Sequence, residues 1–138
     1  EEEKYFIKRI IGIPGDKIEI KDGNVFVNDI QIEEDYLNGE NKGNTKTYFS
    51  SFSEFLVPED QYFLLGDNRN SSTDSRSCFG HTIDIECKNN PQKAFIKSAD
   101  IRGKAWFVWW PLSNIRLIGT ADYPELKNQE SSESLEEK

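Results

Sequence analysis

The chain has 138 residues, a length that suits one domain with a single core. Its net charge of −8 excludes the basic surface that a nucleic-acid partner requires, so no nucleic acid is predicted to bind. No apolar run approaches the roughly 18 residues of a membrane-spanning helix. One His and two Cys fit no familiar zinc pattern, and neither a metal nor an organic cofactor is predicted.

Residues 5–13 are rich in β-branched and aromatic types and predict the first strand. Residues 14–16, Pro-Gly-Asp, predict a tight turn, because Pro presets φ and Gly supplies a positive φ. Alternating apolar residues on both sides of Asp-Gly-Asn at 22–24 predict a β-hairpin. Residues 30–32 indicate one more short strand, whereas 33–46 are polar, rich in Gly and Asn, and predict a surface loop or insertion.

The second half contains shorter signals. Scattered aromatics over 47–57 indicate strand pairing, and the apolar run 61–65 predicts a buried strand. A second insertion is expected at 78–97, and residues 101–110 and 115–118 are expected to be the closing strands. From residue 124 the chain is polar and acidic, so 124–138 are predicted to be a disordered tail after a domain at 1–123.

No apolar period of 3.6 residues persists along the chain. The prediction is therefore a mainly-β fold, a folded sheet or barrel with polar insertions.

Lys8 is the first candidate for chemistry. In a strand it would share a face with Phe6 and Ile10, because side chains alternate. A lysine between large apolar side chains is costly to keep charged, so its amine could accept a proton near neutral pH. The alternative is a lysine that extends past its neighbours into solvent, and the strand pattern alone favours that alternative.

The second candidate is the polar run 66–76, which holds two acids, two arginines, several hydroxyls and an Asn. Such a loop can satisfy itself through Asx turns and an ion pair between Asp74 and Arg76. It can also be a rigid polar support whose hydroxyl, such as that of Ser72, hydrogen-bonds a catalytic amine. The only histidine, His81, has no nucleophile motif beside it, so a Ser-His-Asp triad is not predicted.

Together, the two segments resemble a known family. Residues 8–16, KRIIGIPGD, closely resemble the type I signal peptidase motif KR-hydrophobic-hydrophobic-G-hydrophobic-PGD. Residues 66–76, GDNRNSSTDSR, resemble the GDNRxxSxDSR motif of the same family, and the two occur in the family's order. Gly-Lys-Ala at 103–105 before an apolar strand also fits. The resemblance spans residues 5–117 and implies a signal-peptidase-like mainly-β fold.

The resemblance implies a role for each matching residue. Lys8 corresponds to the general base, and Ser72 to the hydroxyl that orients it. The supporting residues are Asp67, Asn68, Arg69, Asp74 and Arg76. Tyr5, Phe6 and Ile7 correspond to a strand that binds an extended peptide substrate by β-augmentation.

The implied activity is that of a serine endopeptidase that removes signal peptides from exported preproteins by acyl transfer through a Ser/Lys dyad. The implied location is the bacterial inner or plasma membrane, reached through an N-terminal anchor, with the catalytic domain on the extracytoplasmic side.

One element of the family pattern has no match here. The family's nucleophile lies in an S-M-x-P-T-like segment well before the lysine, and no such segment occurs in these 138 residues. We therefore assign no nucleophile, expect both that segment and the anchor to be missing, and expect this chain to be inactive alone. The alternative from another class is a non-catalytic β-domain that binds extended peptides. Self-cleaving repressors, another serine/lysine branch, fit the 66–76 motif poorly.

Two further features leave alternatives open. Cys78 and Cys87 are close enough in sequence to form a disulfide, but two unpaired thiols are equally compatible with the spacing. The run 106–110 is apolar on both strand faces. It could lie in the core, or it could expose aromatic rings suited to a membrane interface.

Overall fold

The computed structural model describes residues 5–48, 54–80 and 90–126. The predicted mainly-β fold is confirmed, since regular structure in these ranges is almost entirely strands and short 3₁₀ helices. The strands are β1 (Arg9–Gly12), β2 (Lys17–Lys21), β3 (Asn24–Val27), β4 (Ile30–Gln31), β5 (Glu54–Leu56), β6 (Gln61–Leu65), β7 (Ile96–Lys97), β8 (Phe107–Val108) and β9 (Arg116–Leu117). The 3₁₀ helices are η1 (Ser75–Ser77), η2 (Pro91–Ala94), η3 (Ser98–Asp100) and η4 (Leu112–Asn114).

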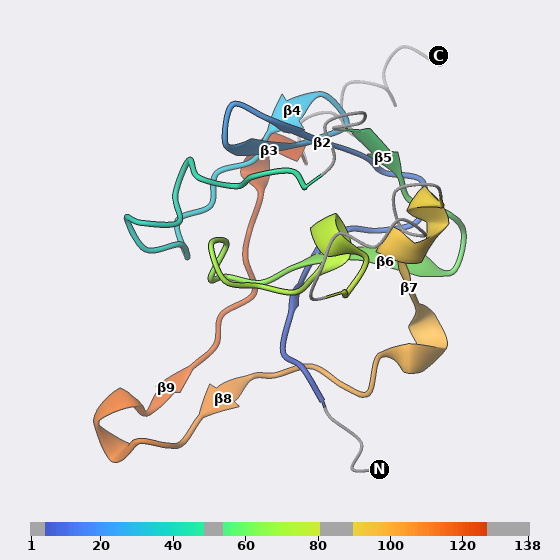
Figure 1. Ribbon diagram of the computed structural model, residues 1–138. Coiled ribbons are helices and arrows are strands. Elements are labelled where there is room, and N and C mark those ends of the chain that lie inside the picture. The colour runs from blue at the N-terminus through green and yellow to red at the C-terminus, as the bar shows by residue number, and fades with distance from the viewer. Residues whose placement is uncertain (1–4, 49–53, 81–89, 127–138) are drawn as a thin grey trace, which may run out of the picture.

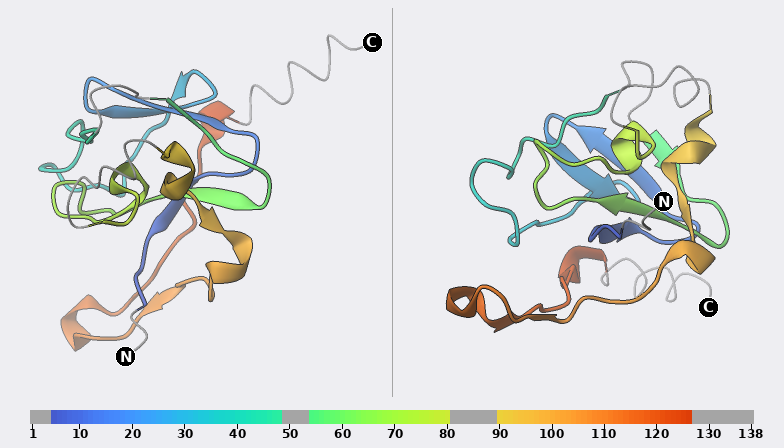
Figure 2. Two further views of the ribbon diagram at one scale, coloured as in Figure 1. Left: turned by 45° about the vertical axis from the view of Figure 1, so that its right-hand side comes forward. Right: turned by 60° about the horizontal axis from the view of Figure 1, so that its bottom comes forward.

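The strands form three antiparallel sheets. One has the order β4-β3-β2-β5, the second has the order β1-β6-β7, and β8 pairs only with β9. Figure 1 shows the first sheet above the second, with the β8–β9 hairpin extending away from both. The views in Figure 2 show the same projection from two other directions.

Both predicted turns form for the expected reasons. Asp16 N donates to Ile13 O at 3.0 Å, and Gly15 occupies positive φ at +90° between them. The hairpin of β2 and β3 has Asp22 and Gly23 at its tip, both with positive φ, which is the geometry of a type I′ turn. The sequence thus determines where the chain reverses in its first 27 residues.

The core lies between the two larger sheets, because its members come from strands of both. Period-two alternation buries every second residue of β2 and β3, and β1 and β6 contribute from the other side. The core residues are Ile11, Ile18, Ile20, Val25, Val27, Ile32, Phe55, Val57, Phe63, Leu65, Ala94 and Phe95. The rings of Phe55, Phe63 and Phe95 follow one another, with centroids 4.8 and 6.2 Å apart.

The loop predicted at 33–46 forms, since the segment has no helix or strand and most of its residues are exposed, but four of its residues do not lie at the surface. Glu34, Leu37, Asn41 and Thr45 of this segment are buried. Polar composition suggested exposure, but these polar groups are satisfied by hydrogen bonds to the loop 66–76. The segment is therefore packed against the loop that carries the second sequence motif.

Several strands are shorter than predicted. The first begins at Arg9, so Lys8 precedes it, and the closing strands shrink to two residues each in β8 and β9. The apolar side chains of this hairpin are exposed, with Trp106 at 67% and Leu117 at 71%, so burial of both faces does not occur. Nothing in the described ranges forms a helix of the length and hydropathy needed to cross a bilayer.

Other predictions fall partly outside the described residues. Cys78 is disulfide-bonded, and the chain's other cysteine, Cys87, lies in the range 81–89 that the structure does not describe, as does His81. Of the predicted tail, only 124–126 is described: it is helical, and Glu125 Oε1 accepts from Glu33 N at 2.8 Å.

Candidate active site

The pairing of β1 with β6 brings the two sequence motifs together. Arg9 lies opposite Leu65 and Ile10 opposite Leu64, so the chain just before β1 meets the chain just after β6. At this meeting point Lys8 Nζ donates to Ser72 Oγ at 3.1 Å, across a sequence separation of 64 residues. Lys8 is half-buried. An amine and a hydroxyl are thus held in contact by the long-range sheet.

Gly66 is buried directly beneath this contact. A Cβ placed on it would lie 2.1 Å from Ser72 Oγ and 3.7 Å from Lys8 Nζ. Gly66 N donates to Asp74 Oδ2 at 3.0 Å, and its carbonyl accepts from Arg69 Nε at 3.1 Å. Only glycine therefore fits at this position of the loop.

Asp74 and Arg76 form a buried, bidentate ion pair. Arg76 Nε donates to Asp74 Oδ1 at 2.9 Å and Nη2 donates to Oδ2 at 2.8 Å, with both side chains fully buried. Arg76 Nη2 also donates to the Arg69 carbonyl at 3.0 Å. The two charges are satisfied inside the loop, which makes its backbone rigid.

The pKa of Asp74 reflects these contacts. Burial raises the pKa of the carboxyl, but hydrogen bonds and charge from Arg76, the Gly66 N–H and the Ser72 hydroxyl outweigh it and lower the pKa below its usual value. Ser72 thus interacts with the Lys8 amine and with the ionised Asp74.

Arg9 and Asp67 form a second ion pair on the other side of β1. Nε and Nη2 of Arg9 donate to the two carboxylate oxygens of Asp67, each at 2.8 Å, and Asp67 remains half-exposed. The Arg9 guanidinium also lies 3.7 Å from the centroid of the Tyr36 ring. This pair links the first strand to the start of the loop.

Arg69 is buried as well, at 1% exposure. Its guanidinium donates to both carboxylate oxygens of Glu34 and to Thr45 Oγ1. Asn68 has a smaller role, since its carbonyl accepts from Ser71 N at 3.1 Å and its side chain is exposed.

Tyr5, Phe6 and Ile7 precede β1 and are 68%, 72% and 81% exposed. Phe6 and Ile10, the expected apolar neighbours of Lys8, are both exposed, although the Phe6 ring centroid lies 5.8 Å from Lys8 Nζ. The 66–76 loop contacts the same amine through the Ser72 hydroxyl.

The structure adds Gly66, Glu34 and Tyr36 to the predicted site residues. Gly66 was within the recognised motif, but its close approach to Ser72 requires coordinates. Glu34 and Tyr36 carried no sequence signal, because the partner of Glu34 lies 35 residues away.

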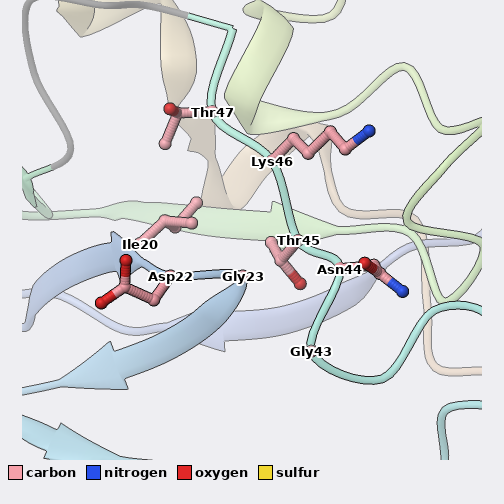
Figure 3. A pocket seen from close by; sticks show the side chains of 8 residues that line it. All are labelled: Ile20, Asp22, Gly23, Gly43, Asn44, Thr45, Lys46 and Thr47. Carbon is pink, nitrogen blue, oxygen red and sulfur yellow. The ribbon is translucent and has the colours of Figure 1, made fainter.

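Of two hollows in the described surface, one borders this site and the other lies away from it. One, of about 690 Å³, is bordered by Arg9, Tyr36 and Asp67 and by the C-terminal segment 116–122. Figure 3 shows the other, between the β2–β3 turn and residues 43–47, and its lining includes no predicted site residue. Within the described ranges, no group of three or more His, Cys, Asp or Glu side chains could hold a metal ion.

The arrangement can support proton transfer. A lysine amine oriented by a hydroxyl, beside a loop fixed by buried ion pairs, can accept a proton from a nucleophile that approaches its free side. An amine held in place by a hydrogen bond is what a general base requires at the least.

Comparisons with known proteins agree with the motifs. The family described as "Signal peptidase, peptidase S26" matches residues 1–110. "Signal peptidase I P" of Bacillus subtilis subsp. natto is 38% identical over 120 residues, covering 84% of this chain and 56% of the relative. "Signal peptidase I" of Bacillus amyloliquefaciens is 35% identical over 119 residues, covering 83% of this chain and 56% of the relative.

The crystal structure of a signal peptidase I from Enterococcus faecalis V583 has a TM-score of 0.46 and 32% identity, covering 70% of this chain and 78% of that one. The chain spans little more than half the length of the curated relatives it matches.

Proposed function

Because this chain belongs to the signal peptidase S26 family, we propose that it is the general-base part of a serine endopeptidase that removes signal peptides from exported preproteins. The observation that carries the proposal is the 3.1 Å hydrogen bond between Lys8 Nζ and Ser72 Oγ. Together with the Arg9–Asp67 ion pair, it joins the two sequence motifs. Lys8 is the general base, and Ser72 holds its amine in position.

The proposed reaction is acyl transfer. A serine hydroxyl attacks the scissile carbonyl and gives its proton to neutral Lys8, and the protonated amine then donates that proton to the departing amine. A water molecule, deprotonated by Lys8, hydrolyses the acyl-enzyme and regenerates the serine. The Asp74–Arg76 ion pair keeps Ser72 fixed through both steps.

The nucleophilic serine comes from a segment outside these 138 residues. Two observations support this proposal. The sequence contains no S-M-x-P-T-like segment, and the chain covers little more than half the length of its relatives. Membership of a membrane-associated family supports a catalytic domain on the extracytoplasmic side of the bacterial inner or plasma membrane.

The substrate is an extended peptide that binds beside Tyr5, Phe6 and Ile7. Their high exposure just before β1 supports this, because β-augmentation needs accessible backbone beside the catalytic amine. Signal-peptide cleavage sites of the A-x-A type present small side chains in such an extended conformation.

The test compares the complete protein with the 138-residue chain, using a fluorogenic peptide that contains a signal-peptide cleavage site. We expect cleavage by the complete protein, loss of at least about 10³-fold in Lys8→Ala, and parent activity in the half-buried control Lys17→Ala, whose amine pairs with Asp29 away from the site. The 138-residue chain should not cleave.

Cleavage by the short chain that depends on Lys8 would overturn the outside nucleophile. Undiminished cleavage by the complete Lys8→Ala protein would overturn the base role. Peptide binding without any cleavage would favour the non-catalytic β-domain.

A further inference from the structure

We propose that Glu34 and Tyr36 are positioning residues that hold the 66–76 loop against β1, the strand that directly follows Lys8, and so set the hydrogen bond between Lys8 and Ser72. The inference deepens the proposed function and rests on it for the meaning of Lys8. The contacts themselves come from the segment 33–46, which neither motif includes.

The loop side of the connection passes through Arg69. Glu34 accepts from both terminal nitrogens of Arg69, with Nη1 at 2.9 Å from Oε2, and both side chains are buried. Arg69 Nε in turn donates to the carbonyl of Gly66, the residue whose Cα lies beneath Ser72. A shift of Glu34 would therefore move Arg69, the Gly66 backbone and the hydroxyl above it.

The strand side passes through Arg9. Its guanidinium lies 3.7 Å from the centroid of the Tyr36 ring, a cation–π contact, and Arg9 is the residue after Lys8. The Tyr36 hydroxyl donates to Glu34 Oε1 at 2.7 Å. Tyr36 thus contacts Arg9 of β1 through its ring and Glu34 through its hydroxyl. These contacts connect the residue next to Lys8, through Glu34 and Arg69, to the loop that carries Ser72.

The charges suit a fixed support. Burial, followed by the nearby Glu34 charge, raises the pKa of Tyr36 far above its usual value, so its hydroxyl keeps the proton that it donates. Burial lowers the pKa of Arg69, but the hydrogen bonds and charge of Glu34 outweigh it, so the guanidinium stays charged. Tyr36 and Arg69 therefore each keep one protonation state across neutral pH.

Two further contacts tie the same segment to the loop. Asn41 Oδ1 accepts from Asn70 N at 3.1 Å, and the Lys46 carbonyl accepts from Arg76 Nη1 at 3.2 Å. Because the loop has several attachments, removal of one functional group at Glu34 or Tyr36 should loosen it without unfolding the chain.

The experiment measures how fast Lys8 is acetylated by limiting N-hydroxysuccinimide acetate in the 138-residue chain, by peptide mass spectrometry. Lys17 and Lys42 serve as internal references. Ser72→Ala is the benchmark and should speed acetylation of Lys8, because the amine loses its hydrogen-bond acceptor. Glu34→Gln and Tyr36→Phe should each speed it by at least about twofold.

Matched controls are Glu59→Gln, which removes an exposed carboxylate, and Tyr62→Phe, which removes a hydroxyl from β6; both should leave the Lys8 rate unchanged. In the Ser72→Ala background, Glu34→Gln should change the rate by less than about 1.5-fold, because the bond it sets is already gone. If Glu34 had only a structural role, the effect of Glu34→Gln on the acetylation rate would instead add to that of Ser72→Ala.

Several results overturn the inference: no effect of Ser72→Ala on Lys8, no effect of either Glu34→Gln or Tyr36→Phe, or full additivity in the double variant. If the Glu34→Gln variant fails to fold, the acetylation rate of Lys8 in Tyr36→Phe alone tests the inference.

In the complete protein, Glu34→Gln should lower kcat and leave KM unchanged, because Lys8 acts in the transition state. If the complete protein cleaves no signal-peptide substrate, the proposed function is wrong. The effect of Glu34 and Tyr36 on the acetylation rate of Lys8 would remain a valid result in that case.

Discussion

Gly66→Ala is the sharpest probe of the site, because the added methyl group has nowhere to go. Its Cβ would lie 2.1 Å from Ser72 Oγ and 2.5 Å from Ser72 Cβ, whereas ordinary contact begins at 3.4 Å. Both polar backbone atoms of Gly66 are hydrogen-bonded, so the backbone resists retreat. Ser72 must therefore move by at least about 1.3 Å, the difference between 2.1 and 3.4 Å.

A displacement of this size breaks the Lys8–Ser72 hydrogen bond, which is only 3.1 Å long at the start. Overpacking of this kind costs about 1–3 kcal/mol of unfolding free energy. A misplacement of about 1 Å in a catalytic group costs about 10²-fold in rate. We expect both losses together in Gly66→Ala.

The measurements are urea unfolding of the 138-residue chain and kcat of the complete protein on a signal-peptide substrate. Gly119→Ala is the matched control, because no heavy atom lies within 4 Å of its added Cβ. Gly66→Ala with Ser72→Gly removes the clashing atoms, so stability should recover while the rate does not. Parent stability and parent kcat in Gly66→Ala alone would show that the close packing described here is wrong.

Three other outcomes follow from the structure. The pKa of Asp74 is lower in the folded state than the ordinary 3.8, so its contribution to stability is present above that pH and is lost as the pH falls through the folded value. Acid unfolding, followed by circular dichroism, should therefore start at a higher pH in the parent than in Asp74→Asn, once the lower stability of the variant at neutral pH is taken into account. Gly23→Ala places a Cβ 1.9 Å from the Gly43 carbonyl at φ +81° and should cost at least about 1–3 kcal/mol in urea unfolding, clearly more than Gly15→Ala, which has positive φ but open space. Cys78 should resist iodoacetamide until a reductant is added, and labelling of the untreated chain, seen by intact mass, would contradict the disulfide.

Local patterns predicted the local structure well. The Pro14–Gly15 turn and the Asp22–Gly23 hairpin form as expected, because both depend on the φ preferences of residues at the turn itself. The alternation of β2 and β3 likewise identified the buried face, since one register leaves only one set of side chains inside.

The setting of Lys8 could not be predicted in the same way. Alternation suggested Phe6 and Ile10 as its apolar neighbours, yet the strand starts one residue after Lys8 and both side chains are exposed. The amine lies over the Phe6 ring but donates its hydrogen bond to Ser72, and that bond depends on pairing between strands about 50 residues apart. Only the family motifs indicated it beforehand.

The burial of polar residues in segment 33–46 was invisible for a related reason. Glu34 and Thr45 are polar residues that composition assigns to the surface. The free-energy cost of burying them is offset because Arg69 donates hydrogen bonds to both side chains. Satisfied polar groups inside a protein leave no local trace in the sequence.

The antiparallel contact of β1 with β6 also governs when the amine and its hydroxyl can meet during folding. Bringing these ends together closes a loop of some 50 residues, a slow step compared with forming the β2–β3 hairpin inside it. A chain that has folded only its local hairpin therefore still has Lys8 and Ser72 far apart. In partly folded or partly degraded forms the Lys8 amine therefore lacks its Ser72 partner, and the two groups meet only once the whole domain has closed.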